Sequence, residues 1–217
     1  MKYKNKLIQI SCDGGAATGK STGAKMIAKK YKLKFMSSGL LYRYASFLIL
    51  KYAPKNKISF LKRQFKNLNY KKIVKKNLHT PKISSFSSVI AKNNNIRKIL
   101  KNFQLKFVKK YKNCCIEGRD ISTKILPNSN LKFFFVCNLN IAATRRFKEL
   151  KKRNPNIKLK DVKKALRVRN ISDTKRKNSP LLKHKNSIVI NSGKYTKKAM
   201  LAKMTRHVEN MLNNYGN

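Results

Sequence analysis

The sequence predicts an α/β fold in which a parallel sheet of five strands carries helices on both faces. Short apolar runs typical of β-strands recur along the chain, at residues 7–12, 34–36, 114–116, 131–137 and 187–191. Segments with helical apolar spacing lie between these runs, and such alternation is typical of a parallel sheet covered on both sides. Ligands of these sheets bind beyond the carboxyl ends of the strands, so we expect the functional residues there.

A phosphate-binding loop follows the first predicted strand. Residues 12–22 read CDGGAATGKST, in which Gly14, Gly19, Lys20 and Ser21 fit the pattern G-x-x-x-x-G-K-[ST]. Glycine lets backbone N–H groups turn toward phosphate oxygens, and the helical segment after the loop adds the positive end of its dipole. The order strand, loop, helix predicts a P-loop NTPase fold. The residues expected to bind ATP are Gly14, Gly15, Ala16, Ala17, Thr18, Gly19, Lys20, Ser21 and Thr22.

The loop also predicts the chemistry of its ligand. Lys20 is expected to reach the β and γ phosphates of ATP, and the Ser21 hydroxyl is expected to hold Mg2+. We expect Asp13, which precedes the loop, to support the metal through a water molecule.

Length and charge limit the range of functions. A chain of 217 residues with 41% hydrophobic residues is enough for one folded catalytic domain. With 54 basic and 7 acidic residues the formal net charge is +47, and a field of this sign attracts polyanions such as RNA, ribosomes or anionic lipid. An AT-rich base composition also favours lysine, although it does not explain the scarcity of acidic residues. Both interpretations stay open, with non-specific polyanion binding expected as a side property.

The cysteines and the apolar runs indicate the compartment. Cys12, Cys114, Cys115 and Cys137 lie in or at the end of strand-like runs and form no C-x-x-C pair. They are expected to be buried free thiols in a reducing compartment, without a metal site. The N-terminal apolar run is too short for a signal peptide, and no run is long enough to cross a membrane. We therefore expect a soluble cytoplasmic protein without membrane insertion.

Two segments are expected to be additions to a single P-loop kinase domain at 1–217. Residues 51–76 are rich in lysine and weakly patterned, which is typical of a small mobile lobe or a helical insert. Residues 141–178 are basic and helical in pattern, apart from Asn154-Pro155-Asn156, and are typical of a lid over phosphates. The predicted core is 1–40, 88–140 and 180–217, with an insert at 41–87 and a lid at 141–179.

Further segments resemble, in order, the bacterial cytidylate kinase family of nucleoside monophosphate kinases. FMSSGLLYR at 35–43 resembles that family's L-D-[ST]-G-A-x-Y-R, and residues 88–104 hold elements similar to A-S-x-V-A, V-R and Q-R. CCIEGRDISTKILP at 114–127 resembles V-V-x-E-G-R-D-I-G-T-V-V-F-P. RNISDTKRKNSPL at 169–181 resembles R-D-x-x-D-x-x-R-x-x-S-P-L, and SIVINSG then matches the closing strand.

The resemblance implies ATP-dependent transfer of the γ phosphate to CMP or dCMP by a monomer. By resemblance the catalytic residues are Lys20, Arg119, Arg169 and Arg176, and the acceptor is bound by Ser38, Arg43, Ser88, Arg97, Arg119, Asp120, Arg169 and Asp173. Arginine suits this chemistry because the loose transition state spreads charge over phosphoryl oxygens that a guanidinium contacts bidentately. Lysine outnumbers arginine about fourfold, 43 to 11, so arginine at these positions is informative.

Several positions leave alternatives open. Arg145 and Arg146 are either solvated helix charge or phosphate contacts of a closed lid. Glu117 either acts as a cap or pairs with a nearby arginine, or it serves the metal. We expect Tyr42 to be part of the core and His79 to be a surface residue.

The sequence also departs from the family pattern. Gly15, Ala17, Ser37, Ser122 and Asn170 stand where the family usually has proline, glycine, aspartate, glycine and aspartate. A β-carbon at Ala17 strains the loop if its φ is positive. The insert is shorter than the family's, which calls its usual hairpin into question.

Two other functions compete with CMP phosphorylation. One is a polyanion-binding protein, for RNA or ribosomes, on a degenerate kinase fold; the basic residues nevertheless lack the interleaved aromatic pattern of a single-strand binder. The other is a P-loop kinase for another small acceptor such as UMP.

Overall fold

A five-stranded parallel sheet forms the centre of the protein. The computed structural model describes residues 6–152 and 154–214, so both ends of the predicted domain, 1–5 and 215–217, and residue 153 lie outside it. The strand order is β2-β3-β1-β4-β5 with every pairing parallel. The strands are β1 (Gln9–Gly14), β2 (Lys34–Ser37), β3 (Cys114–Gly118), β4 (Leu131–Val136) and β5 (Ile188–Asn191). The predicted fold class is confirmed.

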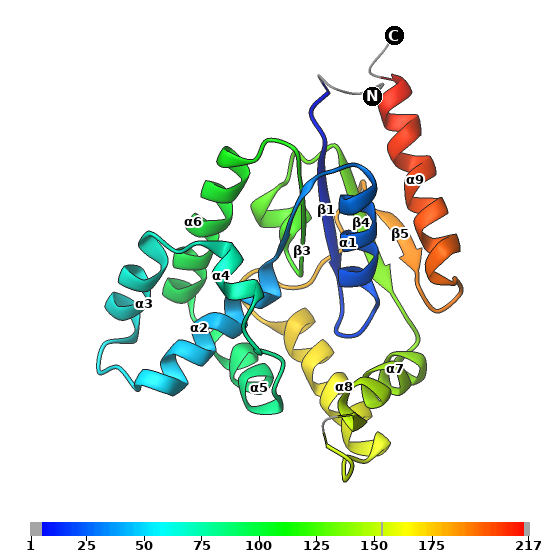
Figure 1. The fold of residues 1–217 in the computed structure, drawn as a ribbon. Helices are drawn as coiled ribbons and strands as arrows, with labels where there is room; N and C mark the ends of the chain where they lie inside the picture. Colours follow the sequence, from blue (N-terminus) through cyan, green and yellow to red (C-terminus); the bar gives the residue numbers. More distant parts are fainter. Residues whose placement is uncertain (1–5, 153, 215–217) are drawn as a thin grey trace.

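Helices cover both faces of the sheet (Figure 1). One face packs against α1 (Lys20–Lys30) and α9 (Lys197–Asn214). The other face packs against α2 (Ser38–Tyr52) and α6 (Asn94–Lys110). A short π-helical turn, η1 (Ile121–Ile125), follows β3.

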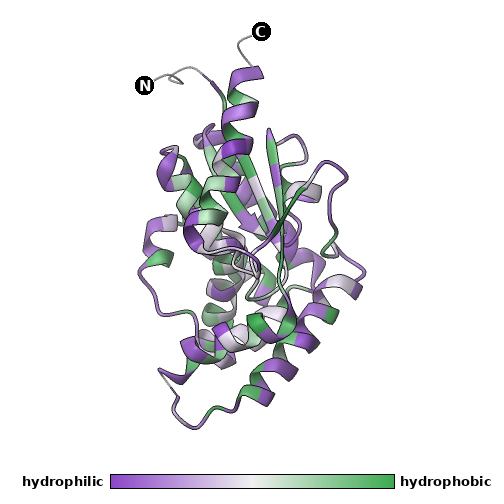
Figure 2. Cartoon of the chain, turned by 90° about the vertical axis from the view of Figure 1, so that its right-hand side faces the viewer, coloured by the Kyte–Doolittle hydropathy of each residue, from purple (hydrophilic) through white to green (hydrophobic). Residues whose placement is uncertain are grey.

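The strands are apolar on both sides because each face is covered. Cys114 packs with α2 and α6, whereas the next residue, Cys115, packs with α1 and α9, since successive side chains of a strand point to opposite faces. Figure 2 shows hydrophobic residues gathered in the strands and hydrophilic residues on the outer turns of the helices. All four cysteines are free thiols, and Cys12, Cys114 and Cys115 are buried as predicted, whereas Cys137 is only partly buried.

The predicted insert is helical throughout. Residues 41–87, all of them described, hold most of α2, then α3 (Lys57–Lys66), α4 (Tyr70–Val74) and most of α5 (Pro81–Ile90), and no strand. The helices start at side-chain caps, because the side chains of Asn56, Asn69 and Thr80 each accept a hydrogen bond from a first-turn N–H. The helical alternative for residues 51–76 is therefore correct, and the family's hairpin is absent from this insert.

The predicted lid is a helical pair, α7 (Leu139–Lys151) and α8 (Leu159–Lys175). Val162 and Leu166 of α8 pack with Ala142 and Ala143 of α7, and this small core includes Ala16 of the phosphate-binding loop. The lid helices consequently lie at the carboxyl end of the sheet beside the loop (Figure 1). No helix in the described part of the chain is long and apolar enough to span a bilayer.

Candidate active site

The phosphate-binding loop connects β1 to α1 at the carboxyl edge of the sheet. Gly14 has a φ of 154°, and a β-carbon there would lie 2.4 Å from the carbonyl oxygen of Phe135. Gly19 has a left-handed φ of 77° and caps α1. Glycine is thus required at Gly14 by the close approach of a neighbouring strand and at Gly19 by backbone conformation.

Lys20, the first residue of α1, is buried in the loop. Its ammonium group donates to the carbonyl oxygen of Gly15 over 3.1 Å and lies 3.8 Å from the Glu117 carboxylate. Burial and the neighbouring Arg119 lower the pKa of Lys20 to about 7, although Glu117 opposes the shift. The ammonium is therefore poorly compensated in the absence of an anion.

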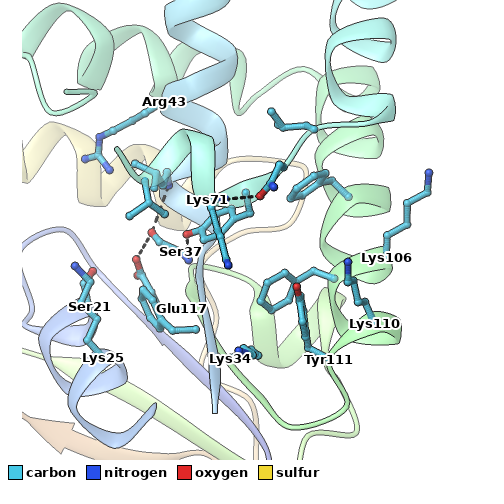
Figure 3. Close-up of a pocket in the computed structure, with 18 of the residues that line it drawn as sticks. Ser21, Lys25, Lys34, Ser37, Arg43, Lys71, Lys106, Lys110, Tyr111 and Glu117 are labelled. Carbon is cyan, nitrogen blue, oxygen red and sulfur yellow. Dashed lines mark hydrogen bonds between the residues drawn. The ribbon is translucent and has the colours of Figure 1, made fainter. Parts of the chain in front are cut away.

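Glu117, at the end of β3, is the carboxylate next to the loop. It accepts a hydrogen bond from the Ser37 hydroxyl (Figure 3). Burial raises its pKa, but Lys20 and the hydrogen bonds from Ser37 and Ser21 outweigh burial and hold that pKa below its usual value. The structure pairs Glu117 with Lys20 and not with the arginine that the sequence offered as one alternative, and it also places this carboxylate beside the Ser21 hydroxyl.

Asp13 bonds to backbone and side-chain groups of η1. Its carboxylate is completely buried and accepts hydrogen bonds from the N–H of Ile121 and from the N–H and hydroxyl of Ser122, over 2.8, 2.7 and 2.6 Å. Its oxygens therefore hold η1 in place, and the water-mediated metal role of Asp13 stays a prediction. Ser122, which replaces the family's glycine, supplies two of these donors, and a glycine would lack the hydroxyl.

Two departures from the family pattern meet in the loop. Ala17 has a left-handed φ of 58°, which is the conformation that a β-carbon strains. Asn170 of α8 accepts a hydrogen bond from the backbone N–H of Ala16 over 3.0 Å. This N–H is one of the loop groups expected to bind a phosphate, and here its partner is the side-chain amide oxygen of Asn170. Sequence analysis missed this contact, and nothing in the sequence except the position of Asn170 in the lid motif indicates it.

The predicted acceptor residues gather around one small hollow beside the loop. Seven of the eight line it, from α2, α5, α6, the end of β3 and α8: Ser38, Ser88, Arg97, Arg119, Asp120, Arg169 and Asp173. Arg176 lines it as well. The hollow has a volume of only about 50 Å³ because side chains from opposite walls are paired across it.

These pairs join acidic and basic side chains of the hollow. Arg97 donates to Asp120, and Arg119 donates to Asp173 over 2.7 Å. Arg176 lies 3.5 Å from Asp173. Buried charges of this kind are stable only when compensated, so each pair can open when a ligand offers replacement groups.

The arginines form one cationic cluster with Lys20. Burial and the neighbouring Arg119 and Arg43 lower the pKa of Arg169 to about 9, and burial and Arg119 lower the pKa of Arg43 to about 10. Nε of Arg169 and Nη2 of Arg176 are buried without a hydrogen-bond partner. Unpaired buried donors in a repulsive cluster favour an anion such as phosphate.

The remaining singled-out residues lie at the rim. Arg43 lines a neighbouring cavity rather than the hollow, yet its charge acts on Lys20 and Arg169. Arg145 donates to the hydroxyl and carbonyl oxygens of Ser192, and Arg146 donates to Glu149. Tyr42 packs against the core and also lines the hollow below Arg97. His79 is exposed, as predicted.

The sequence matches known proteins over almost its whole length. Residues 10–210 match the family model described as cytidylate kinase. A cytidylate kinase of Clostridium botulinum is 33% identical over 87% of this chain and 92% of its own length. Those of Clostridium tetani and Rickettsia africae are 30% and 29% identical, each over 94% of this chain and 95% and 92% of theirs.

Solved structures support the fold. A shikimate kinase from Bacteroides thetaiotaomicron matches with a TM-score of 0.52 and 12% identity, over 93% of this chain and 98% of its own. An uncharacterized protein from Eubacterium ventriosum matches with a TM-score of 0.57 and 17% identity, over 94% and 99%. Together with the family model and the Clostridium relatives, the loop and the arginine-lined hollow lead to one conclusion: this chain belongs to the cytidylate kinase family.

Proposed function

We propose that the protein phosphorylates CMP or dCMP with ATP, giving the corresponding diphosphate by in-line transfer of the γ phosphate. The observation that carries this proposal is the electrostatic coupling between the two sides of the site. The charges of Arg119, Arg169 and Arg43 on the acceptor side each lower the pKa of Lys20 in the phosphate-binding loop, so the donor and acceptor groups form one cluster. A cluster of this kind is suited to two nucleotides whose phosphates meet.

The loop residues Gly14 to Thr22 would hold ATP. Backbone N–H groups and the start of α1 would contact its phosphates, and the ammonium of Lys20 would move from Gly15 to the β and γ oxygens. For Lys20 this exchange relieves the unfavourable burial of its charge.

The oxygen donors at the loop fit Mg2+. The Ser21 hydroxyl and the Glu117 carboxylate are hard ligands, and Mg2+ at nucleotide sites is held by one or two such groups and the phosphates. Among the described residues no three His, Cys, Asp or Glu side chains form a metal cluster, which suits a metal carried by ATP. When bound, the ion would neutralise charge on the β and γ phosphates. In place of Asp13 we propose Glu117 as the supporting carboxylate.

The arginines would bind the acceptor by exchanging partners. Arg119 would leave Asp173 for the acceptor phosphate, joined by Arg43 and Ser38, and Asp173 would accept from the ribose hydroxyls. Arg169 of α8 and Arg176, the residue directly after that helix, would then close on the transferring phosphoryl group, where bidentate guanidinium contacts stabilise its charge. No general base is needed because the attacking phosphate oxygen is already anionic.

Base choice would rest on the buried Arg97–Asp120 pair and Ser88. A carboxylate accepts from the exocyclic amine of cytosine, whereas a keto base presents no hydrogen there. A base whose hydrogen-bonding edge does not match leaves these buried polar groups unpaired, so the preference for cytosine over such a base should be large.

A panel of acceptors tests the proposal. Purified protein with ATP and Mg2+ should form ADP faster with CMP or dCMP than with UMP or AMP, by coupled assay. Lys20→Ala should abolish transfer with unchanged circular dichroism, and Lys197→Ala on the outside of α9 is the matched control that retains transfer. Equal rates with all acceptors would refute cytosine specificity, and activity of Lys20→Ala equal to wild type would refute the donor site.

The same proposal bears on the oligomeric state and the cellular compartment of the enzyme. We infer a monomer in the cytoplasm, where ATP is available and free thiols stay reduced. Sedimentation analysis measures the first expectation, and fractionation of cells measures the second.

A further inference from the structure

A large basic cavity lies beside the proposed active site, on the opposite side of α2 from the acceptor hollow. We call it the basic groove. Its volume is about 860 Å³, and its cationic lining includes Lys25, Lys34, Lys66, Lys71, Lys106 and Lys110. One carboxylate of the described residues, Glu117, lies in its wall and is already paired with Lys20. Figure 3 shows Lys25 on one wall and Lys106 and Lys110 on the opposite wall.

Aromatic rings line the same groove. Phe35 of β2, Phe103 and Phe107 of α6, and Tyr111 are half-buried there. The rings of Phe107 and Tyr111 have centroids 4.8 Å apart, and the ammonium groups of Lys34 and Lys110 lie 5.8 and 5.6 Å from the Tyr111 ring. The fold therefore adds Lys34 and Phe35 of β2 to the lysine and aromatic side chains that alternate along residues 101–112.

The groove continues along α6. A second cavity of about 520 Å³ shares Lys66, Phe103 and Lys106 with it and extends between α3 and α6 toward Lys62 and Lys98. Each cavity is large enough for a nucleotide-sized ligand, since small-molecule sites occupy about 300–1,000 Å³. Two such cavities in sequence suit a chain of nucleotides.

We propose that the basic groove binds single-stranded nucleic acid, in addition to the catalytic function. Lysines along the walls match the charge of the phosphate backbone, and the half-buried rings that line the groove offer sequence-independent stacking for bases. A hollow lined by rings suits splayed single strands better than a duplex or the flat surface of a membrane. The groove and the acceptor hollow have no lining residue in common. Ser21, Arg43 and Glu117 of the proposed active site do line the groove, so we place the strand along the lysines and rings of β2 and α6.

The first experiment measures binding of a fluorescein-labelled 15-nucleotide oligo(U) by anisotropy at several salt concentrations. The groove variant replaces three exposed lysines, Lys34→Gln, Lys106→Gln and Lys110→Gln. The control removes the same charge from exposed residues of α9 on the other face of the sheet, Lys197→Gln, Lys198→Gln and Arg206→Gln.

The groove variant should bind roughly tenfold more weakly, and its slope of log K against log salt should fall by about 2, which is about 0.7 for each lost phosphate contact. The control should keep the wild-type slope. Equal weakening in both variants would mean that net charge alone attracts RNA and would overturn the proposal, as would absence of binding by the wild type.

Stacking is tested with an oligonucleotide that carries 2-aminopurine, whose fluorescence falls when it stacks. The wild type should quench it, and Tyr111→Leu should restore most of the fluorescence at saturating protein. Unchanged quenching in the variant would contradict stacking in the groove.

Competition separates the remaining alternatives. CMP at millimolar concentration should leave the oligonucleotide bound, whereas displacement by CMP would assign the groove to the acceptor site and overturn the proposal. Vesicles with 30% phosphatidylserine should bind the groove variant and the control equally. Selective loss of vesicle binding in the groove variant, with oligonucleotide binding intact, would favour a lipid surface and contradict the inference.

Discussion

Nε of Arg119 donates to Oδ2 of Asp173 over 2.7 Å, and this bond joins the end of β3 to the lid helix α8. Both side chains are mostly buried, and Arg176 adds a second guanidinium to the same carboxylate. The Asp173 carboxylate therefore holds α8 to the core. In the proposed reaction the same carboxylate accepts hydrogen bonds from the ribose hydroxyls.

Removal of this charge should loosen α8 in the ligand-free protein. Asp173→Asn leaves Arg119 and Arg176 without their carboxylate, and breaking a buried pair costs up to about 3 kcal/mol, so local opening of α8 should become easier by about 2 kcal/mol. Slow amides of the helix should exchange with deuterium roughly 30-fold faster by mass spectrometry. Asp161→Asn, an exposed position on the same helix, is the control. Equal exchange in both variants would show that the pair does not hold the lid.

Binding of ATP should take up a proton at pH 8. The pKa of Lys20 is about 7 in the ligand-free protein, well below the usual 10.5, through burial and the neighbouring Arg119, and a triphosphate would raise it again. At pH 8 most Lys20 is therefore neutral before binding and protonated after it, and affinity should fall up to about tenfold per pH unit above pH 7. Titration calorimetry in two buffers of different ionisation enthalpy measures the uptake.

Lys20→Arg is the control for this titration, since arginine keeps its charge at pH 8. The variant should bind without proton uptake from this position. The same uptake in both proteins would exclude Lys20 as the titrating group.

Because of Asp13, the free energy of unfolding should fall as the pH rises, which is the reverse of the usual effect of a paired carboxylate. Burial raises its pKa from 3.8 to about 6, against the hydrogen bonds from Ser122 and Ile121. The folded protein then binds more protons than the unfolded chain between pH 4 and 6, so ionisation of Asp13 lowers the free energy of unfolding as pH rises through this window, and the loss is constant above pH 6. Relative to Asp13→Asn, the wild type should lose about 2 kcal/mol between pH 4 and pH 7.

Urea unfolding at the two pH values measures this difference, and a difference that does not change with pH would contradict it. The same variant separates a structural from a metal role. Glu117→Gln should raise the Mg2+ concentration that gives half-maximal rate, whereas Asp13→Asn should not.

Glycine in place of Ala17 should stabilise the protein. The φ of Ala17 is 58°, and relief of left-handed strain outweighs the larger entropy of an unfolded glycine by about 0.5–1 kcal/mol. The melting temperature should rise by roughly 2–4 °C for a chain of this size. Ala16→Gly, next to it but without a positive φ, should lower the melting temperature. Shifts of the same sign in both variants would show that the strain is unimportant.

The sequence by itself determined the fold class, the phosphate-binding loop and the family. These features are local, since five strand-like runs, a glycine pattern and ordered motifs each lie within a few neighbouring residues. The roles assigned to individual site residues, and the division into core, insert and lid, stay predictions, although the fold brings seven of the eight acceptor residues to one hollow.

Only the tertiary structure decided which groups meet. Asp13 bonds to Ser122 across 109 residues, Ala16 to Asn170 across 154 and Ser37 to Glu117 across 80. The groove likewise joins lysines and rings from β2, α4 and α6. Such contacts depend on strand register and helix packing, because a side chain's partner is set by the three-dimensional arrangement of elements and not by its neighbours in sequence. This is why the sequence left the role of Glu117 open, whereas the fold placed its carboxylate beside Lys20 and Ser21.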